Sequence, residues 1–182
     1  MTSILKVDTI QNSTGTDALS IDSSGRVTNT TKPAFRVYNI ATGSSFKTGH
    51  LTYTNVELNQ GGHWDNTNSV FIVPVSGIYL LSTTNLLCRS DSTSPLASGA
   101  SGSAFIEVSR DSGVSWPTDS VGLRVNRIGC AYGYAEGGIH HPNGNSTVTA
   151  YLDVGDYVRV HTPVGSYYDS TPFSTFSGHL IG

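Results

Sequence analysis

The chain has 182 residues, which is the size of one domain and enough to bury a hydrophobic core. Charged residues make up only 13% of it, the formal net charge is -3, and Ser and Thr supply about a quarter of its residues. The lack of a basic surplus argues against nucleic-acid binding, and the scarcity of Glu, Lys and Met argues against a helical protein.

The first segment, residues 1–31, contains no aromatic residue. Apolar and polar residues alternate around the turn Ser23-Ser24-Gly25, which predicts two or three short strands and a hairpin. The apolar residues are too few to form a core alone, so we expect the segment to pack on copies of itself or on another protein; the alternative is an unstructured leader. The expected attachment residues are Ile4, Leu5, Val7, Ile10, Leu19 and Ile21. We therefore treat residues 1–31 as an amino-terminal attachment segment.

Residues 32–182 are expected to form one all-β domain. The expected strands cover residues 33–40, 52–58, 69–73, 77–87, 103–109, 121–131, 146–152, 156–161 and 176–181. Turn residues separate them every ~8 to 15 positions, and residues 90–102 are expected to form a long surface loop. No helical period is present, so the spacing indicates an antiparallel sandwich or jelly roll.

Three motifs follow one another along this domain. Residues 59–65 read Asn-Gln-Gly-Gly-His-Trp-Asp, and residues 71–79 continue with Phe-Ile-Val-Pro-Val-Ser-Gly-Ile-Tyr. A Leu-Asp-Val-Gly-Asp-Tyr-Val hairpin lies at 152–158, and a Phe-Ser-Gly-His-Leu-Ile strand at 176–181. The series resembles the globular-head family of the complement q subcomponent, which is related to tumour necrosis factor. The resemblance implies a jelly roll of about ten antiparallel strands, assembled as a threefold homotrimer.

The same resemblance implies aromatic packing around the trimer axis, where Tyr is suitable because its ring is apolar and its hydroxyl can find a partner. The residues expected to pack in the core or in the trimer are Phe35, Phe71, Tyr79, Tyr151, Tyr157 and Phe176. Relatives in this family often hold calcium near the trimer apex. The loop acids that could serve here are Asp65, Asp91 and Asp169, although no calcium-loop spacing is present.

The amino-terminal segment resembles a second group of proteins. Residues 3–12 read Ser-Ile-Leu-Lys-Val-Asp-Thr-Ile-Gln-Asn, and residues 18–27 read Ala-Leu-Ser-Ile-Asp-Ser-Ser-Gly-Arg-Val. They are similar to leader segments of structural proteins of marine phages, particularly phages of cyanobacteria, where they accompany virion fibre or surface modules. The resemblance implies assembly onto a virion inside the host cytoplasm, and it agrees with the lack of a visible secretory signal.

Catalytic and cofactor motifs are not visible. The sequence has no Gly-x-Ser-x-Gly elbow, phosphate loop, dinucleotide fingerprint or zinc spacing. His140 and His141 beside Glu136 are the best metal-like cluster, but adjacent histidines on a strand point to opposite faces. Cys88 and Cys130 are expected to be buried reduced thiols. We therefore expect no enzyme activity and no cofactor. We also expect no membrane span, because the apolar runs stop at strand length.

The expected function is that of a non-enzymatic trimeric virion structural protein of a tailed phage, located on the virion. It would be either a capsid decoration (cement) protein or a short tail fibre, with other virion proteins as partners. The alternative is a receptor- or glycan-binding module, in a tail fibre or in a free bacterial lectin-like protein. Aromatic side chains that could stack on sugar rings are Trp64, Trp116, Tyr167 and Tyr168. The sequence leaves the capsid or tail location, the host and the receptor open.

Overall fold

A computed structural model of the chain describes residues 4–29, 31–40, 46–89, 91, 93–117, 127–135, 141–167 and 174–182. These residues form fourteen strands and no helix, which confirms the all-β prediction. Within the same ranges no helix is long and apolar enough to span a bilayer.

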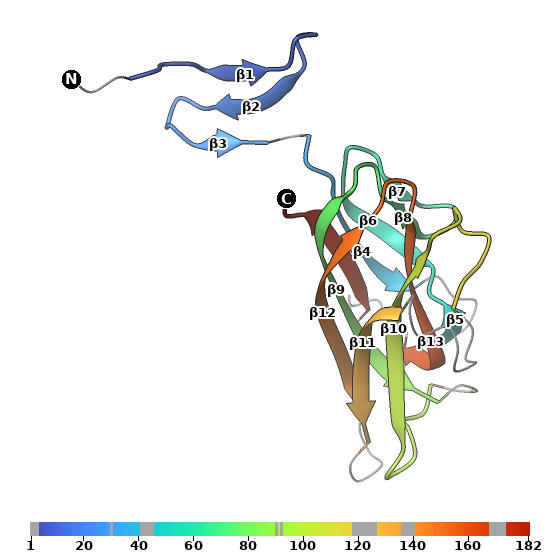
Figure 1. Cartoon of the computed structure of the whole chain (residues 1–182). Helices are drawn as coiled ribbons and strands as arrows, with labels where there is room; N and C mark the ends of the chain where they lie inside the picture. Colours follow the sequence, from blue (N-terminus) through green and yellow to red (C-terminus); the bar gives the residue numbers. More distant parts are fainter. Residues whose placement is uncertain are drawn as a thin grey trace.

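A small sheet forms the amino-terminal segment. It consists of β1 (Thr9–Gln11), β2 (Asp17–Ile21) and β3 (Val27–Thr28), in that order and antiparallel. The side chains of Asn12 and Asp22 each accept hydrogen bonds from two backbone amides of their own turn, at 2.9 to 3.0 Å. Figure 1 shows this sheet (blue) lying apart from the rest, beyond the end where the C-terminus lies. The predicted short strands and hairpin are therefore present.

The body is a sandwich of two antiparallel layers (Figure 1). One layer has the order β12-β9-β14-β4-β6, and the other contains β11, β10, β13, β8, β7 and β5. The layers join where the ends of β9 and β13 pair. The strands are β4 (Ala34–Ile40), β5 (Phe46–His50), β6 (Tyr53–Gln60), β7 (Trp64–Asp65), β8 (Val70–Ile72), β9 (Gly77–Cys88), β10 (Ser101–Ser109), β11 (Arg127–Tyr134), β12 (Asn143–Leu152), β13 (Tyr157–Tyr167) and β14 (Thr175–Leu180).

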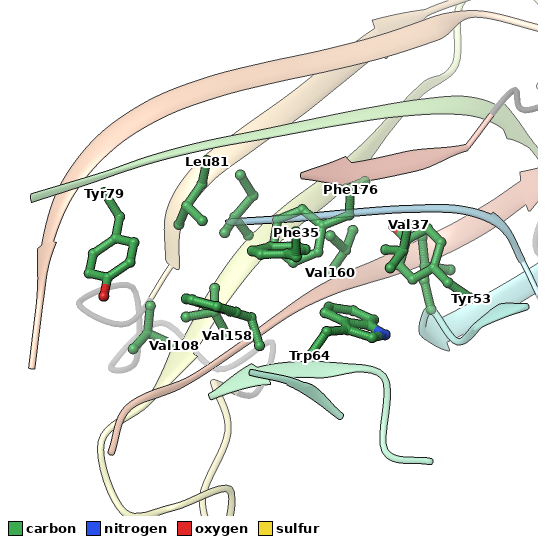
Figure 2. Close-up of a cluster of buried hydrophobic side chains, with 14 of the residues drawn as sticks. Phe35, Val37, Tyr53, Trp64, Tyr79, Leu81, Val108, Val158, Val160 and Phe176 are labelled. Carbon is green, nitrogen blue, oxygen red and sulfur yellow. The ribbon is translucent and has the colours of Figure 1, made fainter. Parts of the chain in front are cut away.

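Aromatic rings dominate the core between the two layers (Figure 2). Phe35 is central, because its ring centroid lies 4.6 Å from Phe71, 4.9 Å from Phe176 and 5.2 Å from Trp64. Offset stacked and edge-to-face contacts at such distances add to the free energy gained by burying the rings. Rings contributed by both layers thus hold the sandwich together.

One glycine explains the carboxyl-terminal Phe-Ser-Gly motif. A Cβ atom on Gly178 would lie 2.5 Å from Cδ2 of Leu81 and 2.8 Å from Cε1 of Phe35. No side chain fits there without displacing the core, so β14 can lie over these residues only with glycine at this position.

Several strand limits differ from the sequence prediction. β5 was not expected, because residues 46–50 show no apolar alternation; it forms by pairing with β13, which itself extends past the predicted end at His161. β12 begins at Asn143, before the expected strand start at 146. Gly144 allows close packing there, since a Cβ on it would lie 3.3 Å from the Ala131 carbonyl. The start of the expected strand 121–131 lies outside the described residues up to 126, and the rest belongs to β11.

The two cysteines are both free, but they differ in environment. Cys88 is buried as predicted, and burial raises the pKa of its thiol to about 12. Cys130 is exposed, so the prediction of burial was wrong for this residue. Its neighbour Ala131 points into the core, and strand alternation therefore turns Cys130 outward.

Candidate functional site

The outward surface of strands β12, β9, β14 and β4, here called the assembly face, is poor in charge. Cross-strand partners share a face, so the register defines it as Ala34, Arg36, Tyr38, Ile78, Leu80, Ser82, Thr84, Leu86, Asn145, Thr147, Thr149, Tyr151, Thr175, Ser177 and His179. Arg36 is the one member with a permanent charge, and it pairs with Glu57 of β6. Ile78 and Tyr151 are exposed by 44% and 60%. The face thus offers aliphatic and hydroxyl groups to solvent with almost no charge.

The six residues expected to pack in the core or the trimer separate into two groups. Phe35, Phe71, Tyr79 and Phe176 are buried in the core of the single chain. Tyr151 lies on the assembly face, where a trimer contact remains open to it. Tyr157 is half-buried on the opposite layer and lines a hollow there.

That hollow, here called the outer hollow, has a volume of about 380 Å³. Its lining residues are His50, Asn68, Val70, Ser112, Gly113, Trp116, Tyr157 and Arg159. Nε1 of Trp116 donates to the carbonyl of Gly113 at 3.0 Å, and the guanidinium of Arg159 lies 3.8 Å from the ring centroid. Of the residues expected to stack on sugars, Trp116 therefore lies in a hollow. Trp64 is buried in the core against Phe35, so the prediction was wrong for this residue. Tyr168 and the side chain of Tyr167 lie outside the described part of the chain.

A buried carboxylate next to this hollow was not predicted. Glu107 of β10 is fully buried, and its Oε1 accepts from Nε of Arg127 at 3.0 Å. Its Oε2 accepts from Nε and Nη2 of Arg159, both at 3.1 Å. Both arginines are its direct cross-strand partners, and Nδ1 of His161 lies 3.7 Å from Oε1. Glu107 therefore fixes Arg159 against Trp116.

Sequence alternation could not reveal this burial. Ile106 and Val108 point into the core, so Glu107 belongs to the outward face of its layer, where a carboxylate is normally solvated. It is buried only because long side chains from the two neighbouring strands fold over it. The two arginines opposite Glu107 could have indicated its burial. Recognising them requires the register of β10 with its two neighbouring strands, which the sequence does not provide.

Stability is expected to decrease below about pH 6.5 because of His50 in the outer hollow. Burial lowers the pKa of His50 from 6.5 to about 4, while its Nε2 lies 3.2 Å from the carbonyl of Ser69. Between these pH values the unfolded chain binds a proton that the folded chain excludes, so the folded state loses at most about 3 kcal/mol. Urea unfolding at pH 7.5 and pH 4.5 measures the loss, and His50→Gln should reduce it. An equal loss in that variant would assign the effect to other groups.

The candidate metal ligands do not converge in the described part of the chain. No group of three or more His, Cys, Asp or Glu side chains placed to hold an ion occurs there. Asp65 accepts hydrogen bonds from the side chain and backbone of Asn68, which lower its pKa, and Asp91 is exposed. Asp169, Glu136 and His140 lie outside the described residues, and Nδ1 of His141 lies 3.3 Å from the carbonyl of Leu87.

The predicted attachment residues lie in the small sheet and in the extended segment before it. Ile4, Leu5 and Ile10 are exposed by 74%, 82% and 45%. Val7, Leu19 and Ile21 are half-buried. The structure thus leaves apolar groups of this segment open to solvent.

No family model matches the chain, and no curated protein sequence does. Among solved structures, a crystal structure of murine APRIL is similar, with a TM-score of 0.58 and 11% identity over 82% of this chain and 99% of that one. The globular domain of a zebrafish complement 1qA protein has a TM-score of 0.49 and 15% identity, over 83% of this chain and 98% of its own. The likeness to APRIL, a tumour-necrosis-factor-family protein, shows that this chain has the antiparallel jelly-roll fold of that family, as predicted.

Proposed function

We propose that the protein is a non-enzymatic homotrimeric structural protein of the virion of a tailed phage of cyanobacteria. The observation that carries the trimer is the charge-poor assembly face on a jelly roll of this type. The phage assignment rests on the sequence of the leader, residues 3–12 and 18–27, and on the open apolar groups of that segment.

The two layers differ in how suitable their outward surfaces are for association. The assembly face presents Ile78, Leu80 and Tyr151 with no unpaired charge, and such surfaces can be buried without desolvating ions. The opposite layer carries Glu107, Arg127 and Arg159, whose charges already form ion pairs with one another. Mass measurement in solution tests the proposal: we expect three times the 19.3 kDa of one chain. A stable monomer at micromolar concentration would contradict it.

Deleting residues 1–31 is expected to leave a folded trimer that no longer enters particles. The body keeps its whole core without them, and the junction residue Lys32 still donates to the carbonyl of Ile181 at 2.9 Å. The measurements are mass in solution and the protein content of particles assembled with the truncated chain. Unfolding of the truncated chain would show that the segment belongs to the core. Normal incorporation would show that attachment occurs through the body.

The location of the protein on the virion distinguishes a capsid decoration protein from a short tail fibre. A capsid decoration protein covers the shell, whereas a short tail fibre occurs only at the tail. Labelling of intact particles with an antibody against the body gives the answer directly. Label found only at the tail would exclude capsid decoration.

Glycan binding is the second candidate function, favoured by the outer hollow. Trp116 and Tyr157 offer aromatic surfaces beside the amide of Asn68, a combination common in sugar sites. A glycan array with the purified protein should show selective binding that Trp116→Ala abolishes. A protein with a purely structural role would bind no sugar selectively.

A further inference from the structure

The three-stranded sheet of the amino-terminal segment separates its side chains into two unlike faces. Ile10 pairs with Leu19, and Ile21 pairs with Val27. Leu19 and Ile21 are two positions apart on β2, so all four aliphatic side chains share one face. The other face consists of Thr9, Ser20 and Thr28, which pair with one another in the same way.

This sheet cannot be stable by its own burial. A unit of fewer than ~40 residues normally requires disulfides, a metal or oligomerisation. The segment contains no cysteine, and the described residues contain no metal-ligand group. Ile10 and Val27 remain exposed by 45% and 62%, so the aliphatic face requires a cover that the single chain does not provide.

We propose that this cover is the same face of the two other copies, so that three small sheets enclose an aliphatic core on the threefold axis. This inference rests on the proposed homotrimer. The four paired positions carry no charge, and two acidic side chains near them find partners within the segment: Asp17 accepts from Nε2 of Gln11 at 2.6 Å, and Asp22 pairs with Arg26 at 2.7 Å. Like faces can therefore meet without burying an ion, which makes the surface self-complementary.

The connection to the body favours copies of this chain over a separate partner. Only residues 29–33 separate β3 from β4, a strand of the assembly face layer, and a linker this short spans at most ~18 Å. The side chain of Gln60 donates to the carbonyls of Asn29 and Lys32, at 3.3 and 2.5 Å, and fixes where the segment leaves the body. A trimer built on the assembly face thus holds three small sheets close together, at an effective concentration of about millimolar.

The packing would divide the predicted attachment residues by role. Ile10, Leu19 and Ile21 would be used within the trimer. Ile4 and Leu5 precede β1 and lie outside the sheet, so they remain available for a virion partner.

Disulfide cross-linking of the full-length protein tests the inference. The background is Cys130→Ser, because Cys130 is exposed whereas Cys88 is buried. Leu19→Cys places a thiol on the aliphatic face, and the matched control Ser20→Cys places one on the hydroxyl face of the same strand. Disulfides form only between Cα atoms that approach within about 7 Å. We expect covalent dimers from Leu19→Cys at a yield about tenfold above that from Ser20→Cys, and the same ranking for Ile10→Cys against Thr9→Cys.

Two measurements on the unmodified protein distinguish the possible outcomes: its mass in solution gives the oligomeric state, and hydrogen exchange gives the protection of the amides in β1 to β3. A trimer with protected amides in β1 to β3 and selective cross-linking supports the inference. A trimer with equal cross-linking from both faces, or with none, overturns it and leaves the homotrimer standing. Protection of β1 to β3 that arises only after particles are added also overturns it, because the cover is then another virion protein. A monomer rejects the homotrimer and the inference together.

Discussion

Leu80→Asp is expected to convert the trimer into a folded monomer. Leu80 lies near the start of β9 on the assembly face, between its partners Thr149 of β12 and His179 of β14. In a monomer the new carboxylate reaches water, so the free energy of unfolding should change by less than about 1 kcal/mol. In the trimer three carboxylates would be desolvated, at a cost of several kcal/mol each. Analytical ultracentrifugation measures the assembly, and urea unfolding measures the stability of the fold.

Val114→Asp is the matched control for this substitution. Val114 is 83% exposed and follows β10, in the other layer of the sandwich. It receives the same charge, yet the trimer should persist. A trimer that survives Leu80→Asp and Ile78→Asp alike would place the interface elsewhere. Unfolding of the Leu80→Asp chain would show instead that this position contributes to the core.

The motifs predicted the layered core well because each fixes a buried position. Phe71 and Tyr79 bracket the Pro-Val-Ser-Gly turn, and Phe176 precedes the glycine that lets β14 approach Phe35. The residues of each motif are close together in the sequence, so their pattern can be recognised from the sequence alone. Tyr151 has the same local character, but its face depends on the pairing of β12 with β9. Alternation shows that successive residues point to opposite faces, and it does not show which face is covered.

The outer hollow could not be predicted for a related reason. Its walls come from β5, from β8 and the loop before it, from the loop after β10 and from β13, and these segments are distant in sequence. Trp116 was predicted as a residue that could stack on sugar rings, but nothing local indicates that Arg159 lies over its ring. Asn68, His50 and Tyr157 become its neighbours only when β13 pairs with both β5 and β8.

Glu107→Gln is expected to lower the free energy of unfolding by about 3 to 5 kcal/mol. The substitution preserves the shape of the side chain but removes the only carboxylate that balances Arg127 and Arg159 in the ion pairs described here. The side chains of these arginines are only 15% and 13% exposed, so water compensates them poorly. Urea unfolding at pH 7.5 measures the change. Glu57→Gln is the matched control, because its pair with Arg36 is about half exposed and such pairs contribute at most about 1 kcal/mol.

A second readout separates a local role of Glu107 from a general loss of packing. Glu107 holds the guanidinium of Arg159 over Trp116, so its neutralisation should change the fluorescence of Trp116 under conditions where the chain is still folded. Trp64 is the other tryptophan of the chain and lies in the core, so a Trp64→Phe background isolates the signal of Trp116. If stability falls while the emission of Trp116 is unchanged, Arg159 keeps its position without the carboxylate. If both change together, one buried carboxylate sets the stability of β10 and the shape of the hollow, so sugar binding there should weaken in the same variant.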